Sequence, residues 1–177
     1  MFSMAARCPW CAPLAELSVE YEMAILLLGK SKCGLCGEVI RAEEDACAFP
    51  AFGLNNANAM AVFSDGVFHR SCVEADARYY ALAELLREWE ANTGPGRRKC
   101  DECGNQIVTP DDYVFVDWLT EDVAAPLHAF NFTHLHGSCL PRWRRKEEFL
   151  AAARGVLASK EWSDSGLDQI VGKIEGA

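Results

Sequence analysis

The sequence contains no long hydrophobic run and no obvious targeting segment. Its longest apolar stretch, residues 23–28, is far shorter than the roughly 20 residues that a membrane-spanning helix needs. The chain does not open with a basic leader followed by a small-residue cleavage site, which is the pattern of a secretory signal. We therefore expect a cytoplasmic protein with no membrane partner.

Basic residues are also scarce. Lysine and arginine number 17 against 26 acidic residues, which gives a formal net charge of −9 at pH 7. A protein this negative is repelled by phosphate backbones unless its basic residues are segregated. The sequence also lacks a glycine-rich phosphate loop, a serine–histidine–acid arrangement and paired catalytic carboxylates. These absences favour a protein that is not an enzyme and has no small-molecule substrate.

Cysteine, in contrast, is abundant, with nine residues in a chain of 177. An odd number of cysteines cannot all pair, and the cytosol keeps thiols reduced, so disulfides are not the expected explanation. The hydrophobic fraction of 50% suits a folded chain with one compact domain or two small ones. Metal binding is the expected role of the cysteines.

Six cysteines and two histidines form two quartets with the same spacing, C-x2-C, then 32 residues, then H-x2-C. The first quartet is Cys33, Cys36, His69 and Cys72, and the second is Cys100, Cys103, His136 and Cys139. Every member of the second lies 67 positions after its counterpart. The same offset gives ten identities in the 42 positions from Lys32 to Val73, where average composition predicts roughly two or three. We interpret this as an internal duplication in which each quartet closes its own site.

The residue types of the quartets suit zinc. Thiolate and imidazole are the usual ligands of a tetrahedral structural zinc ion, and four protein ligands leave no position open to a substrate. Gly37 and Gly104 follow the second cysteine of each C-x2-C, where the backbone often needs positive φ. An H-x2-C pair in the first turn of a helix presents both ligands on one face. The sequence therefore predicts two zinc ions per chain.

The segments Lys32–Gly37 with Phe68–Cys72, and Lys99–Gly104 with Leu135–Cys139, resemble two treble-clef zinc fingers. In that family a zinc knuckle leads into a β-hairpin and then a helix whose first turn supplies the last two ligands. The LIM domain is the nearest named relative by ligand type, but 27 residues separate Cys72 from Cys100, where a LIM pair has almost none. A RING-like cross-brace would mix the two quartets, which the duplication argues against. The resemblance implies a fold and a metal but no activity.

The predicted fold class is α+β, with two tandem zinc-stabilised treble-clef units and helical extensions at both ends. The first repeat spans residues 31–94 and the second spans 97–158, with a Gly-Pro-Gly cluster at the boundary. Residues 1–30 form an N-terminal extension, predicted to be helical over 14–28. Residues 163–177 form a C-terminal amphipathic helix whose apolar face is Leu167, Ile170, Val171 and Ile174.

Apolar and β-branched content predicts a hairpin in each repeat. In the first repeat we expect strands over 46–52 and 59–63, followed by a turn at 64–66. In the second we expect strands over 113–119 and 129–132.

One helix is expected after each H-x2-C. The first helix carries Tyr79, Leu82, Leu86 and Trp89 at helical spacing. The second has Pro141 in its first turn, where a missing N–H costs nothing, and carries Leu140, Trp143 and Leu150 on one face.

Cys8 and Cys11 form another C-x2-C that has no counterpart in the repeat. Three interpretations stay open: a reduced surface turn, a redox dithiol, or half of a third zinc site. The third site would be completed by Cys47, His128 or His134, or by a second chain. Cys47 lies in an apolar segment and is expected to be packed in the core.

Basic residues cluster only at Arg97–Lys99 and at Arg142–Lys146. The second cluster could contact phosphates while Trp143 stacks on a base, which would make the protein a nucleic-acid-binding zinc finger. The alternative is a solvated helix face with Trp143 in the core, and the net charge favours it. His134 with Asn131 faintly resembles an HNH-type nuclease, another treble-clef relative, but the full constellation of that family is not found.

The function expected from these features is a non-enzymatic protein-binding module, such as an adaptor, an inhibitor or an immunity-type protein. Nucleic-acid binding through Arg142–Lys146 is the alternative, and an HNH-like nuclease is the second alternative. Surplus aromatic residues could form an exposed apolar patch for a protein partner. They are Trp10, Phe49, Phe52, Trp118 and Trp162.

Overall fold

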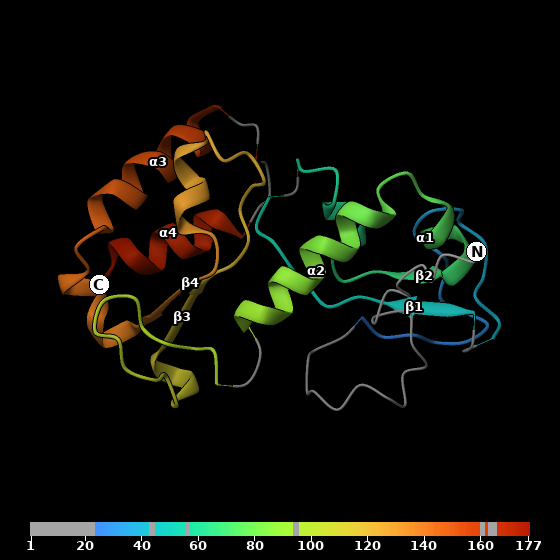
Figure 1. The fold of residues 1–177 in the computed structure, drawn as a ribbon, viewed down its shortest axis with the longest axis horizontal. Helices are drawn as coiled ribbons and strands as arrows, with labels where there is room; N and C mark the ends of the chain where they lie inside the picture. Colours follow the sequence, from blue (N-terminus) through green and yellow to red (C-terminus); the bar gives the residue numbers. More distant parts are fainter. Residues whose placement is uncertain (1–23, 43–44, 56, 94–95, 160–161, 163–165) are drawn as a thin grey trace, which may run out of the picture. The chain divides into compact units, whose positions relative to one another are not determined.

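The structure is a computed structural model of residues 1–177, shown in Figure 1. It describes residues 24–42, 45–55, 57–93, 96–159, 162 and 166–177. These residues form helices and two small antiparallel hairpins, a mixture consistent with the α+β class. None of the helices in this part of the chain is long and apolar enough to span a bilayer.

The chain forms two compact units. The first contains the residues up to 51 together with 62–86, and the second contains 52–61 and 87–177. This division follows packing, whereas the boundaries expected at 31–94 and 97–158 follow the sequence repeat and stay a prediction.

In the first unit, β1 (Ala46–Ala48) pairs antiparallel with β2 (Val67–His69). Strand β2 leads directly into α1 (Arg70–Ala75), and α2 (Tyr79–Thr93) begins after a short break. Between the two strands in sequence lies the 3₁₀ helix η3 (Ala61–Phe63).

The core of the first unit centres on three phenylalanines. Phe49, Phe63 and Phe68 are fully buried, and their ring centroids lie 5.4 to 6.2 Å apart. The ring of Phe68 comes within 2.5 Å of where a Cβ on Gly66 would be, so only glycine fits there. The hairpin is thus held by aromatic packing on a glycine-lined strand entry.

In the second unit, β3 (Tyr113–Val116) pairs antiparallel with β4 (Thr133–His136). Three short 3₁₀ helices surround this hairpin, and two α-helices follow it (Figure 1). The 3₁₀ helices are η4 (Pro110–Asp112), η5 (Pro126–Phe130) and η6 (Gly137–Arg142), and the α-helices are α3 (Lys146–Ser159) and α4 (Leu167–Glu175).

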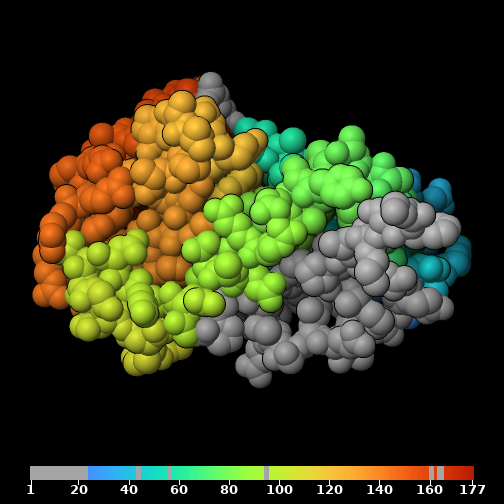
Figure 2. Space-filling model, in the orientation of Figure 1, coloured from blue at the N-terminus to red at the C-terminus, as the bar shows by residue number. Residues whose placement is uncertain are grey.

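The predicted C-terminal amphipathic helix is present as α4, and it packs against α3. Its residues Leu167, Val171 and Ile174 are buried in the core of the second unit, and Ile170 packs against that core. In Figure 2 the orange and red atoms, which belong to α3, α4 and the segments before them, form one closely packed body. The apolar face of α4 is therefore satisfied within the chain.

Residues 52–61 join the second unit because they run along residues 117–121. The N–H of Gly53 donates to the Asp117 carboxylate (3.0 Å), and the N–H of Leu54 donates to the Trp118 carbonyl (2.9 Å). The side chain of Asn55 adds a hydrogen bond to the carbonyl of Leu119 (3.1 Å).

The expected strand over 59–63 is wrong, because residues 61–63 form η3 instead. The side-chain oxygen of Asn58 accepts a hydrogen bond from the N–H of Met60 (2.7 Å), and its carbonyl accepts one from Ala61 (3.0 Å). Asparagine stabilises turns in this way. Strand β1 also ends at Ala48, short of the expected residue 52.

The expected strand over 129–132 is wrong for a similar reason. Most of it belongs to η5 and the turn that follows, where the Asn131 side chain bonds the N–H of Leu119 (2.8 Å) and the carbonyl of Thr120 (2.7 Å). The strand over 113–119 is present only as far as Val116. Its partner is β4, the segment that runs into His136.

Each H-x2-C is followed by two short helices and not by one. In the first unit the chain turns extended at Asp76, whose carboxylate accepts a hydrogen bond from the N–H of Arg78 (2.8 Å). In the second, Pro141 sits inside η6, where it lacks the N–H of a regular helix. The three residues expected on one helical face are still buried, but they come from η6, its end and α3: Leu140, Trp143 and Leu150.

Two further expectations need correction. The N-terminal helix expected over 14–28 lies largely outside the described residues, and 24–28, which are described, are not helical. The aromatic residues expected to form an exposed patch are core residues: Phe49, Phe52 and Trp118 are at most 4% exposed, and Trp162 packs against the core of the second unit. Trp10 lies outside the described residues.

The second unit contains a buried carboxylate at its centre. Asp117 accepts hydrogen bonds from the N–H groups of Gly53 and Trp118 and from the indole of Trp89 (3.1 Å). Burial raises the pKa of Asp117 to about 6, although these three donors lower it. This side chain joins β3's end, the end of α2 and the segment after Phe52.

We predict a pH-dependent stability difference between the wild type and an Asp117→Asn variant. A carboxyl group with a higher pKa in the folded state binds more protons when folded, so stability falls as pH rises through that pKa. The free energy of unfolding of the wild type, minus that of the variant, should decrease between about pH 5 and about pH 7. Urea denaturation of the metal-loaded protein measures it.

The matched control is Asp111→Asn, a change at an exposed residue of the same unit. Its difference from the wild type should stay flat over this range. A difference for Asp117→Asn that grows with pH would contradict the assigned burial of a proton-binding carboxyl.

Candidate metal centres

The first quartet assembles around a tight turn. Cys33 and Cys36 lie between Lys32 and Val39, which form an isolated antiparallel bridge. The N–H of Gly37 closes the turn on the Cys33 carbonyl (2.8 Å), and Gly37 has a φ of 76°, a conformation that favours glycine. His69, at the end of β2, and Cys72, in α1, complete the group.

The second quartet uses the same construction. Cys100 and Cys103 lie on a turn closed by the N–H of Gly104 on the Cys100 carbonyl (2.7 Å), with a φ of 74° at Gly104. His136 ends β4, and Cys139 lies in η6.

The backbone contacts of the two groups also correspond at the offset of 67 residues. In the hairpins, Ala46 pairs with His69 and Tyr113 pairs with His136. The helices α2 and α3 begin at Tyr79 and Lys146, which again differ by this offset. The repeat in the sequence is therefore matched by equivalent contacts at both metal groups.

The geometry of each group fits one metal ion. One donor atom from each of its four residues lies within 4.8 Å of the others. The Nδ1 atom of His69 is 3.4 Å from Cys36 Sγ and 4.0 Å from Cys72 Sγ, and His136 Nδ1 is 3.5 Å and 4.0 Å from the equivalent sulfurs. The bond lengths of a tetrahedral zinc ion imply about 3.6 Å between sulfur and nitrogen ligands. Each group could therefore hold one ion through three sulfurs and a histidine Nδ1.

Backbone N–H groups favour the thiolate form of the first cysteine in each group. The N–H of His69 donates to Cys33 Sγ (3.3 Å), and the N–H of His136 donates to Cys100 Sγ (3.4 Å). Burial by itself would raise the pKa of both thiols, but the backbone hydrogen bonds outweigh it and lower the pKa to about 6 for Cys33 and about 7 for Cys100. Both sulfurs are thus prepared as ligands.

The last cysteine of each group shows the opposite effect. Burial, together with the neighbouring sulfurs of Cys33 and Cys36, raises the pKa of Cys72 to about 11. Sulfurs this close cannot all ionise without a compensating charge. A bound divalent cation supplies that charge and makes deprotonation of all the sulfurs favourable.

The second group has an extra hydrogen bond that the first lacks. Arg142 Nη2 donates to Cys139 Sγ at 3.2 Å, whereas the residue 67 positions earlier is Ala75. Burial raises the pKa of Cys139, and this hydrogen bond lowers it. Outer contacts of this kind stabilise a metal ligand.

The third metal site stays untested. Cys8 and Cys11 lie outside the described residues, and among the described ones the two quartets are the groups that could hold a metal. Cys47 is 1% exposed on β1, which agrees with its expected core position. It is disulfide-bonded, so the expectation that all the cysteines are reduced is wrong there.

The residues of the nuclease alternative are used structurally. His134 is 5% exposed, its ring stacks on Phe115 (4.8 Å between centroids), and its Nδ1 lies 2.8 Å from Tyr113 Oη. Burial lowers the pKa of His134. Asn131 holds the backbone of residues 119 and 120, as described above, and His128 lies in η5. These positions do not form a catalytic constellation.

The Arg142–Lys146 cluster is largely committed to partners within the chain. Arg142 bonds Cys139, and Arg144 pairs with Glu102 at 3.3 Å. Arg145 pairs with Glu148 at 2.9 Å and lies 4.1 Å above the ring of Phe130. Trp143 is 5% exposed, as the solvated-face interpretation requires, and is not available to stack on a base.

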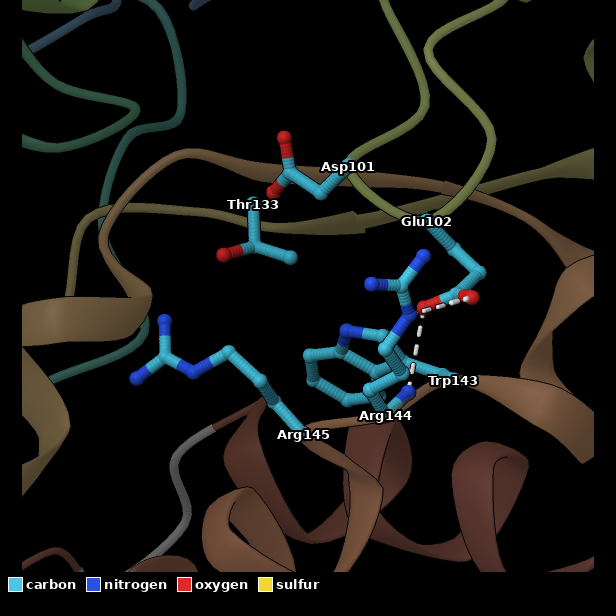
Figure 3. A pocket seen from close by; sticks show the side chains of 6 residues that line it. All are labelled: Asp101, Glu102, Thr133, Trp143, Arg144 and Arg145. Atoms are coloured by element: carbon cyan, nitrogen blue, oxygen red, sulfur yellow. Dashed lines mark hydrogen bonds and ion pairs between the residues drawn. The ribbon is translucent and has the colours of Figure 1, made fainter.

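One pocket of about 400 Å³ lies beside the second metal group (Figure 3). The sequence gave no signal for it, because its residues come from three separate segments. It is lined by Asp101, Glu102, Thr133, Trp143, Arg144 and Arg145.

No protein-family model, curated protein or solved structure matches this chain. Function must therefore be inferred from the chemistry of its residues.

We predict two metal ions per chain, held independently. Native mass spectrometry of the zinc-reconstituted protein should show two ions, and Cys36→Ser and Cys103→Ser should each show one, because each removes a ligand from a separate group. The exposed Ser71→Ala, between two ligands, is the control and should keep both ions. Two ions retained by either cysteine variant would contradict the ligand assignment.

We also predict that the two ions leave at different pH. Metal binding requires deprotonated sulfur, and the Arg142 hydrogen bond favours the thiolate of Cys139. As pH falls, the second group should release its ion at a lower pH than the first, and Arg142→Ala should remove this difference. A chromophoric zinc chelator reports release, with Cys36→Ser and Cys103→Ser identifying each group. Equal release in the wild type would argue against a role for Arg142.

Proposed function

We propose that this protein is a non-enzymatic, zinc-stabilised module of two treble-clef units that binds another protein. The observation that carries the proposal is the pair of Cys3His groups, each with four donor atoms converging within 4.8 Å. Three sulfurs and one imidazole are a set that favours zinc. The equivalent backbone contacts at both groups support an origin by internal duplication, with one ion for each copy.

The role of zinc in this proposal is structural. Each ion would complete its tetrahedron with protein ligands alone, which leaves no position for a substrate or an activated water. Binding of zinc to small finger domains is worth about 10–16 kcal/mol at neutral pH, similar to the whole net stability of a domain, about 5–15 kcal/mol. Hairpins of three and four residues per strand are not stable without such support.

A protein partner is favoured over nucleic acid by the use of the basic residues. Three of the four arginine and lysine side chains in the Arg142–Lys146 cluster have acceptors within the chain, and the net charge is −9. Phosphate binding would have to break these pairs and work against the net charge. An adaptor, an inhibitor and an immunity-type protein all fit this description, and a cytoplasmic location remains part of the proposal.

The proposal is tested by binding measurements on the zinc-loaded full chain. Cross-linking in the native host, followed by nuclease digestion and mass spectrometry, should recover a stoichiometric protein that binds again when purified. Cys103→Ser, which loses a ligand of the second group, should bind it more weakly. Fluorescence anisotropy with single- and double-stranded oligonucleotides at low salt should show no binding. Recovery of nucleic acid alone, with salt-sensitive binding lost in Arg144→Ala, would overturn the proposal.

A further inference from the structure

The pocket beside the second metal group contains a buried donor with no acceptor. Trp143 is 5% exposed, and within the described part of the chain its indole N–H has no hydrogen-bond partner. Buried indole N–H groups usually have one, as Trp89 does in its bond to Asp117 (3.1 Å). In Figure 3 the indole nitrogen lies on the ring edge that faces the open space toward Thr133. The pocket therefore offers a donor to a bound molecule.

Three of the four charged residues that line the pocket are already paired. Glu102 accepts hydrogen bonds from the backbone N–H of Arg144 (3.0 Å) and from its Nε (3.3 Å). Arg145 donates twice to Glu148, at 2.9 Å each, and once to the carbonyl of Ala129 (3.0 Å). These pairs fix the pocket wall and neutralise one another.

Asp101 is the charged residue that is left over. Its side chain is hydrogen-bonded to Thr133, and among the described residues it is in no ion pair. It directly follows Cys100, in a group where three thiolates would face one divalent ion and leave a negative balance. The pocket thus combines an uncompensated negative charge with a nearby N–H donor.

The first unit shows that the fold does not need these polar groups. At the positions 67 residues earlier it has Gly34 for Asp101, Gly66 for Thr133 and Asp76 for Trp143. There the ring of Phe68 comes within 2.6 Å and 2.5 Å of where Cβ atoms on the two glycines would be, so an aromatic ring fills the space. The polar lining belongs to the second unit alone.

A ligand that satisfies both groups carries a cation and a hydrogen-bond acceptor close together. The amino terminus of a polypeptide has this arrangement, with an ammonium group next to the carbonyl of the first residue. A lysine side chain brings the cation without the nearby carbonyl, and a carboxylate or phosphate is repelled by Asp101. A pocket of about 400 Å³ is small for a ligand site, which suits the terminal residues of a chain.

We propose that this pocket binds the free amino terminus of a polypeptide, with the ammonium group on Asp101 and the first carbonyl on the indole N–H of Trp143. This inference rests on the proposed protein-binding function and names the part of the partner that is recognised. Thr133, whose hydroxyl can both donate to Asp101 and accept from the ligand, is a second contact for the ammonium group.

The test uses the zinc-loaded full chain and trialanine amide as the probe. Titration should move the indole ¹H–¹⁵N NMR resonance of Trp143 to a saturating position. Acetylation of the amino terminus or Asp101→Asn should weaken binding by about tenfold or more, because each removes a charge-assisted hydrogen bond. The exposed Asp111→Asn should bind as the wild type does, and unchanged amide spectra establish that the variants are folded.

N-acetyl-lysine amide separates the amino terminus from an ammonium group alone, and it should bind more weakly than trialanine amide. Equal binding of the acetylated peptide, equal binding of N-acetyl-lysine amide, or no movement of the Trp143 resonance would overturn the inference. If trialanine amide fails to bind while the cross-linked partner still binds, the pocket assignment is wrong and the protein-binding function stands. If the partner is also absent, both are wrong.

Discussion

The structure depends on bringing three thiol sulfurs and an imidazole within 4.8 Å of one another, twice. Without a cation this is unfavourable, because crowding by its neighbours and burial raise the pKa of Cys72 to about 11 while backbone donors lower that of Cys33 to about 6. A divalent ion removes the conflict, since it attracts every sulfur at once. The hairpins, with four paired residues at most, are too short to establish this arrangement by themselves. Metal binding and folding are therefore one process in this protein.

The sequence predicted the metal groups well because ligand chemistry constrains spacing. The turn after Cys33, the glycine with positive φ and the histidine at the end of a strand all follow from the need to aim four donors at one point. The common offset of 67 residues then assigned each ligand to its own group. Nothing in this argument required knowledge of long-range packing.

The strands were predicted poorly, because their position is decided by side chains that act locally on the backbone. Apolar content favoured strands over 59–63 and 129–132, but Asn58 and Asn131 bond nearby backbone groups and give turns and 3₁₀ helices instead. The true partner strands are the residues that lead into each histidine ligand. The ligand pattern, which requires a knuckle to face that histidine, was a better guide to pairing than β propensity.

The pocket could not be predicted from sequence for another reason. Its residues have ordinary individual explanations: Asp101 and Glu102 lie within a metal-binding turn, and Trp143 has the spacing of a core residue. Their significance appears only when the turn, β4 and the end of η6 are placed together. Comparison of the two units then separates what the frame needs from what it carries, since glycine and phenylalanine fill the same place in the first unit.

The pocket and the second metal group share the same short segments. Asp101 and Glu102 lie between Cys100 and Cys103, and Trp143 ends the helix η6 that contains Cys139. The ion that draws these cysteines together consequently also sets the distance between the carboxylate and the indole N–H that face the ligand. A structural metal can thus control recognition without touching the bound molecule, since the ligand groups are preorganised by the same turn and helix. This explains how a closed zinc group, which has no chemistry of its own to offer, still places functional side chains.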